Sequence, residues 1–187
     1  NNIINENSNT ITIGASGDTI ALAGTTVTGI TQGITMVDQF ALTSNFSLSN
    51  GENIITANLA RVSNGESPGF IGTGMTESSG IFTFPSTGIY MITFNAYASS
   101  SAAALYNTRQ IQVTLNNSSY ATAASSDGNF YTGTSYDSSP VQYILDVTDT
   151  ANVKVRFRID GQGTNTTLLG NSGTNDTSFT FIRLGDT

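Results

Sequence analysis

The sequence predicts an all-β domain of the two-sheet jelly-roll type. Short runs in which apolar and polar residues alternate recur along the chain, and this is the period of half-buried strands. Clusters of Gly, Pro, Asn and Ser separate the runs, and helical periodicity is not sustained anywhere. We expect about eight to ten strands, which is enough for two packed sheets.

The first strands of the domain follow from alternating apolar residues between residues 36 and 62. Phe40 and Leu42 belong to one strand and lead into Phe46 and Leu48. The pair Asn50-Gly51 favours a turn, because both residues tolerate positive φ. The run 54–62 is expected to be a further strand.

The central pair of strands is predicted at 81–84 and 89–97. Pro85 and Gly88 separate them, since Pro lacks an N–H and Gly allows positive φ. Their aromatic and aliphatic residues recur at every second position and should face the core or a subunit contact. With two residues of the last strand, the predicted core or trimer set is Phe82, Phe84, Tyr90, Ile92, Phe94, Phe179 and Phe181.

The later strands show the same alternation. The strand 109–115 should place Arg109, Ile111, Val113 and Leu115 on one face, and 141–147 follows with Val141, Tyr143, Leu145 and Val147. The strand 153–159 should bury Val153, Val155, Phe157 and Ile159. Residues 178–184 form the last strand.

Residues 1–35 differ in texture from residues 36–187. The run 10–24 holds two short alternating segments around Gly-Ala-Ser-Gly-Asp. Strands this short bury too little surface alone to offset their ordering entropy, but three copies wrapped together would be stable. We predict a β-rich stalk or anchor at 1–35 and a head at 36–187; an ordinary hairpin of the head is the alternative.

The phrase Phe-x-Phe-Pro-x-x-Gly-x-Tyr-x-Ile-x-Phe at 82–94 resembles the central motif of the C1q/TNF-like jelly rolls. The strand 153–159 and the closing residues 177–181 are similar to the late strands of that superfamily. The segment 10–24 resembles segments of bacteriophage fibre and virion proteins. These resemblances imply a C1q/TNF-like head that is a homotrimer, that binds other molecules and that is not an enzyme.

Composition excludes several classes of function. The net charge is −7 with six cationic residues, so binding to nucleic acid or to an anionic membrane is not expected. No apolar run is long enough to span a bilayer, so we expect no membrane insertion. The chain has no Cys and no His, which removes disulfides and the commonest nucleophiles, bases and metal ligands.

A polar segment at 116–140 is the candidate ligand-binding loop. Tyr offers contact area at low entropic cost, and Ser, Gly and Asn offer adaptable hydrogen bonds, a mixture that suits glycans. The candidate residues are Tyr120, Asp127, Phe130, Tyr131, Tyr136 and Asp137. The alternative is that these tyrosines fill a trimer axis or close a sheet end.

The charged residues give weaker indications of function. Asp127 and Asp137 could form a carboxylate pair for hydrolysis. The better interpretation for both, and for Asp146, Asp149 and Asp160, is that they form turns or lie at solvated loop tips. Lys154, Arg156 and Arg158 form a basic stripe, which is either an anion site or a strand paired with neighbouring acids. We predict no cofactor and no metal site; loop oxygens would suit Ca²⁺, but their spacing is undefined.

The leading hypothesis is therefore a virion structural protein on the surface of an extracellular particle. It would be a trimeric phage fibre, head fibre or decoration protein, joined to other virion proteins through its N-terminal segment. Its head would attach to a host-surface glycan or receptor, with weak contacts multiplied by trivalency. The alternatives are a capsid-stabilising cement protein without a receptor and a secreted C1q-like lectin or adhesin.

Overall fold

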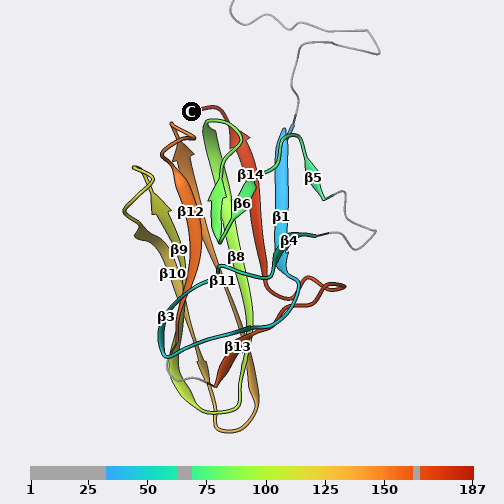
Figure 1. Ribbon diagram of the computed structural model, residues 1–187, viewed down its shortest axis with the longest axis vertical. Coiled ribbons are helices and arrows are strands. Elements are labelled where there is room, and N and C mark those ends of the chain that lie inside the picture. The colour runs from blue at the N-terminus through green and yellow to red at the C-terminus, as the bar shows by residue number, and fades with distance from the viewer. Residues whose placement is uncertain (1–32, 63–68, 162–164) are drawn as a thin grey trace, which may run out of the picture. The chain divides into compact units, whose positions relative to one another are not determined.

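The computed structural model describes residues 33–62, 69–161 and 165–187, and all of its regular elements are β-strands (Figure 1). Residues 33–187 make up one compact unit, to which all the strands below belong. The predicted stalk at 1–35 lies outside the described residues, apart from its last three. Within the described residues, no helix is long and apolar enough to cross a bilayer.

The first sheet is built on the long strand β8. Its described strands are β1 (Met36–Leu42), β2 (Phe46–Ser47), β4 (Leu59–Arg61), β5 (Phe70–Ile71), β8 (Gly88–Ser100), β11 (Ser135–Val147), β13 (Thr166–Leu168) and β14 (Ser178–Gly185). On one side β8 pairs with β11; on the other it pairs with β14 and, at its end, with β13. β14 pairs with β1, and β1 pairs with β4 and β5, which lie at that border of the sheet.

The second sheet is centred on β9 and β12. Its described strands are β3 (Gly51–Ile54), β6 (Thr76–Ser78), β7 (Ile81–Thr83), β9 (Ala104–Thr114), β10 (Ala121–Phe130) and β12 (Lys154–Gly161). The order is β10-β9-β12-β7-β6, and β3 pairs with the other half of β12. All strand pairs in both sheets are antiparallel.

The strand registers define two ends of the sandwich. The start of β1, the start of β8, the end of β11 and the end of β14 meet at one end, which is uppermost in Figure 1. We call this the entry end. The turns between β8 and β9 and between β10 and β11 lie at the opposite end, the far end (Figure 1).

Aromatic side chains from both sheets fill the space between them. Phe82 of the second sheet lies 5.1 Å from Phe181 of the first, and Phe157 lies 4.5 Å from Phe179, between ring centroids. Phe94 stacks on Phe179 with an interplanar angle of 12°. Each fully buried side chain of this size contributes about 1.5–3 kcal/mol, and each ring pair adds about 0.5–1.5 kcal/mol.

The residues predicted to face the core or a subunit contact lie in the core of a single chain. All are at most 2% exposed within a single chain, so none is available to a second subunit. These residues are Phe82, Phe84, Tyr90, Ile92, Phe94, Phe179 and Phe181. The inward faces of 141–147 and 153–159 are also as predicted, except that Tyr143 is only partly buried.

Three local predictions need correction. The run 54–62 is not one strand, because β3 ends at Ile54 and β4 begins at Leu59, with Asn58 at φ +63° between them. Leu115 does not face the core; it follows the end of β9 and is 69% exposed. The segment 116–140 is not a loop, because β10 and the first half of β11 occupy most of it.

Candidate functional site

The outer face of the first sheet carries a row of apolar side chains that crosses four strands. Val37 of β1 lies opposite Ile182 of β14, Ile182 opposite Met91 of β8, and Met91 opposite Ile144 of β11. Directly paired residues share one face of a sheet, so these four side chains form a continuous band. We call it the apolar row. Ile144 is 61% exposed, so the β11 end of the row is open to solvent.

The next row toward the far end is polar and internally hydrogen-bonded. Gln39 Nε2 donates to Thr180 Oγ1 over 2.8 Å, and Gln142 Nε2 donates to Thr93 Oγ1 over 3.3 Å. Beyond it, the rings of Tyr97 and Tyr136 stack with centroids 5.9 Å apart. The outer face is thus apolar near the entry end and polar toward the far end.

An apolar groove runs along the border beside β11. β10 and β11 contact each other near the far end, where Ser126 Oγ donates to the Ser139 carbonyl over 3.3 Å. Toward the entry end, residues of both sheets line an open groove of about 420 Å³. We call it the edge groove; its lining is Val113, Leu115, Ala121, Thr122, Ala123, Tyr143, Leu145 and Asp146.

The outer face of the second sheet is polar, and most of its side chains form hydrogen bonds or ring contacts with one another. Arg156 Nε donates to Gln112 Oε1 over 2.8 Å, and its guanidinium lies 4.1 Å from the centroid of the Tyr120 ring. Thr122 Oγ1 donates to Gln110 Oε1 over 2.9 Å. Burial raises the pKa of Tyr120, partly offset by Arg156.

The predicted basic stripe does lie on this outer face, and its residues have local partners. Arg158 forms ion pairs with Glu52 of β3 and with Asp160 of its own strand. Lys154 Nζ donates to the Thr150 carbonyl over 2.6 Å. The interpretation as a strand paired with neighbouring groups is therefore favoured over a free anion site.

The six candidate ligand residues do not form one cluster. Tyr120 lies beside Arg156 near the entry end, whereas Tyr131 and Tyr136 are exposed near the far end. Phe130 is a core residue, because it is only 4% exposed. Asp127 accepts a hydrogen bond from Thr108 Oγ1 over 2.6 Å. A ligand role for this set stays a prediction.

Asp137 joins the two sheets instead of facing outward. It forms an ion pair with Arg109, whose side chain is completely buried between the sheets. Arg109 Nη1 also donates to the Asn107 carbonyl over 3.0 Å. Burial lowers the pKa of Arg109, and the nearby Asp137 partly offsets this effect. This pairing gives Asp137 a partner within the fold.

Asp149 is a turn former, as predicted from the sequence. Its carboxylate accepts hydrogen bonds from Asn152 Nδ2 over 2.6 Å and from the Ala151 N–H over 2.8 Å. These two hydrogen bonds lower the pKa of Asp149. Across the described ranges, no three acidic residues gather in a way that could hold a metal ion.

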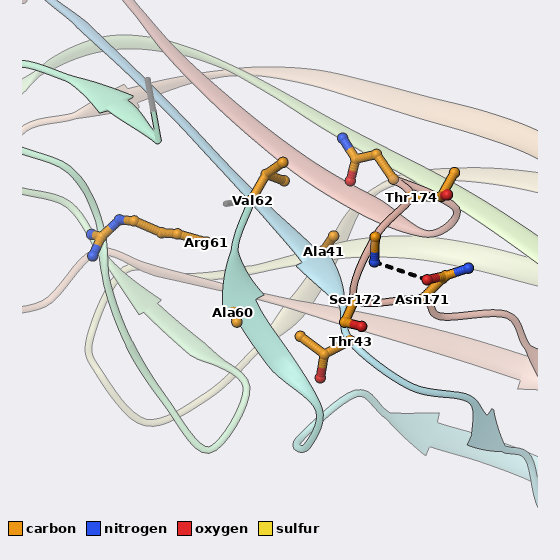
Figure 2. Close-up of a pocket in the computed structure, with 10 residues that line it drawn as sticks. Ala41, Thr43, Ala60, Arg61, Val62, Asn171, Ser172 and Thr174 are labelled. Carbon is orange, nitrogen blue, oxygen red and sulfur yellow. Dashed lines mark hydrogen bonds between the residues drawn. The ribbon is translucent and has the colours of Figure 1, made fainter. Parts of the chain in front are cut away.

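A small hollow lies over β1 and β4 on the outer face of the first sheet (Figure 2). Its volume is about 180 Å³. Ala41, Ala60 and Val62 form its floor, and the loop 171–175 forms its wall. Thr43, Asn171, Ser172, Thr174 and Asn175 supply its polar groups. We call it the Asn175 pocket.

Sequence reasoning missed the apolar row, the edge groove and the Asn175 pocket. The apolar row can be recognised only when the pairing registers of four strands are known. The alternation of residues within one strand does not reveal these registers. For Ile144 the sequence does hold a signal. Ile144 is apolar, but it lies between Tyr143 and Leu145, whose side chains point inward, so its own side chain must point outward. The sequence of residues 171–175 predicts a turn-rich segment but gives no indication that it forms the wall of a pocket.

Comparison with solved structures identifies the fold. The chain is similar to three crystal structures of murine APRIL, determined at pH 8.5, pH 5.0 and pH 8.0. The TM-scores are 0.55, 0.58 and 0.55 and the identities are 13%, 12% and 12%. Each match covers 80% of this chain and 98% of the other chain. No protein-family model and no curated protein sequence matches this chain. At this level of identity the likeness shows the fold, and the predicted TNF-like jelly roll is confirmed.

Proposed function

We propose that this chain is a non-enzymatic structural protein whose head assembles into a homotrimer on the surface of a virus particle. The observation that carries the proposal is the apolar row, which lies on the outer face of the first sheet and ends at the exposed Ile144. An apolar band across four strands needs a cover in water, and a second copy of the chain supplies one.

The geometry of the patches favours a ring over a twofold dimer. The apolar row lies on a sheet face, whereas the edge groove lies at the β10–β11 border and is lined in part by Tyr143 and Leu145, the neighbours of Ile144. Two different apolar patches on one subunit suit a heterologous contact, in which the face of one copy meets the edge of the next. Heterologous contacts generate a ring when the rotation between neighbouring copies closes. The resemblance to C1q/TNF-like heads supports three as the number of copies.

The virion role rests on the segment 10–24, which resembles segments of phage fibre and virion proteins, and on the jelly roll that follows it. In this arrangement the N-terminal residues contact other virion proteins. The proposed host contact is the far end of the head, where Tyr131 and Tyr136 are exposed. Three copies multiply weak contacts to a glycan or receptor. The absence of His and Cys from the sequence supports a role without catalysis.

Light scattering tests the assembly. The purified chain should have a mass of about three times 19.6 kDa. Ile144→Asp places a charge at the exposed end of the apolar row and should yield a folded monomer, because Ile144 contributes little to the core of its own chain. Ile81→Asp is the matched control, since Ile81 is exposed on β7 of the other sheet and should leave the trimer intact. A monomeric wild-type chain would refute the proposed trimer.

The number of copies per particle distinguishes a fibre from a decoration protein. A fibre occurs in few copies, whereas decoration or cement covers the capsid in many. Quantitative mass spectrometry of purified particles measures this number. Absence of the chain from particles, together with a cell-surface location, would instead favour the secreted lectin or adhesin.

A further inference from the structure

The wall of the Asn175 pocket is fixed by main-chain hydrogen bonds at both ends. The Asn171 N–H donates to the Leu42 carbonyl over 2.9 Å, and the Leu42 N–H donates to the Thr177 carbonyl over 3.0 Å. Within the loop, the Gly173 N–H donates to Asn171 Oδ1 over 2.8 Å (Figure 2). The pocket is therefore preformed, and a ligand would not need to order it.

The inside of the pocket presents no free charge. Arg61 borders it, but its side chain points away from the Asn171–Thr174 loop (Figure 2). The Arg61 guanidinium instead pairs with the buried Asp38 over 3.1 Å and lies over the Phe40 and Phe70 rings. The groups that remain are hydroxyls and amides above a floor of methyl groups. This lining matches a neutral ligand with both hydroxyl and C–H surfaces.

Asn175 supplies a buried acceptor that has no donor. Its Nδ2 donates to Gln39 Oε1 over 2.7 Å, and Gln39 Nε2 in turn donates to Thr180 Oγ1 over 2.8 Å. This chain of hydrogen bonds fixes the orientation of the Asn175 amide. Its Oδ1 is then buried and has no partner in the part of the chain that the structure describes. A buried acceptor without a donor is costly, so the occupant of the pocket should donate a hydrogen bond there.

We propose that the Asn175 pocket binds a single neutral sugar ring of a glycan. A ring hydroxyl donates to Asn175 Oδ1, other hydroxyls reach Thr43 and the loop 171–174, and a C–H face of the ring packs on Ala41, Ala60 and Val62. The cavity of about 180 Å³ limits the ligand to about one ring. The inference rests on the host-attachment part of the proposed function and adds to the far-end contact a site with a stated ligand class. The site lies by β4, at the opposite border of the sheet from the edge groove.

NMR titration of the full chain tests the proposal. The probes are methyl α-glucoside, methyl β-galactoside and the methyl glycoside of N-acetylglucosamine. At least one should shift the side-chain amide signals of Asn171 and Asn175 saturably at millimolar concentration. Ala60→Leu fills the floor of the pocket and should weaken that binding by about tenfold or more. Ala151→Leu, at the exposed turn between β11 and β12, is the matched control and should bind like wild type.

Two results would overturn the sugar site. One is the absence of a saturable shift with all three glycosides; the other is binding that Ala60→Leu leaves unchanged. Asn175→Ala provides a second check, because it removes the acceptor and should also weaken binding while light scattering still reports the wild-type mass. A chain that is trimeric but binds no sugar refutes this site and leaves the assembly proposal standing; a monomer that binds sugar does the reverse.

Discussion

Asp137 of β11 reaches the buried guanidinium of Arg109 on β9 through the space that the missing side chain of Gly128 leaves on β10. A Cβ at position 128 would overlap Asp137 Oδ2 and Arg109 Nη1. The ion pair therefore links the two sheets across an intervening strand, and it requires glycine at that point.

Gly128→Ala should destabilise the domain by about 1–3 kcal/mol, because the new methyl group must displace one or both charged groups. Urea denaturation measures the change in the free energy of unfolding. Gly185→Ala is the control, since a Cβ there meets nothing within 4 Å. If the two variants are equally stable, the Asp137–Arg109 ion pair does not depend on the space at Gly128.

Asp137→Ala should cost roughly 3–5 kcal/mol, because it leaves a buried arginine without its carboxylate. The double variant Arg109→Met with Asp137→Leu should recover most of this loss, since an apolar pair has no charge to desolvate. Chemical denaturation of the single and double variants provides the comparison. If the double variant is as unstable as Asp137→Ala, the loss does not arise from an unpaired charge.

Phe82→Ala should destabilise the domain by about 3–5 kcal/mol. Phe82 contacts Phe40 and Phe181 at 5.1 Å each and joins the two sheets at the centre of the core. Tyr131→Ala removes a similar ring that is 75% exposed, and it should change stability by less than about 0.5 kcal/mol. Thermal or urea unfolding of the two variants measures their free energies of unfolding. The comparison distinguishes the effect of burying a ring from the effect of its size.

The turn between β11 and β12 should weaken in acid. Hydrogen bonds from Asn152 and Ala151 lower the pKa of Asp149 in the folded chain, so the stabilisation is complete above the unfolded pKa of about 3.9. It is lost as the pH falls through the lower folded pKa. A ¹³C NMR titration should give Asp149 a pKa below that of an unperturbed aspartate. Asp149→Asn should show a smaller loss of stability over this acid range, and an identical pH profile would contradict the assignment.

The core could be predicted because it depends on alternation within single strands. Tyr90, Ile92 and Phe94 recur at every second position and all face inward. The same rule placed Arg109 beside Ile111 and Val113, and the structure buries all three. The partner of Arg109 could not be predicted, because Asp137 comes from the other sheet and is adjacent only after the sheets stack.

The sequence of β10 lacks the pattern of a strand for a physical reason. Among the described strands β10 pairs only with β9, at an edge of the sheet, and residues 121–129 are mainly small or polar. Ala123 and Ala124 cover the core at the border of the sandwich, where large side chains are not needed. Hydrophobic alternation, the signal for a strand, is therefore almost absent. The apolar row and the Asn175 pocket were missed because each combines strands and loops distant in sequence.

The pairing of β1 with β14 sets a limit on when this domain can fold. It joins residues 36–41 to residues 178–183, so almost the whole domain must leave the ribosome before the first sheet closes. Until then β1 is a nascent strand with Phe40 and Leu42 unburied. Contacts this distant in sequence slow folding and prolong the time during which unpaired apolar strands are exposed to solvent. Synthesis of the last strand is thus the step that commits the chain to its native structure, and truncation before residue 178 should yield an aggregation-prone product.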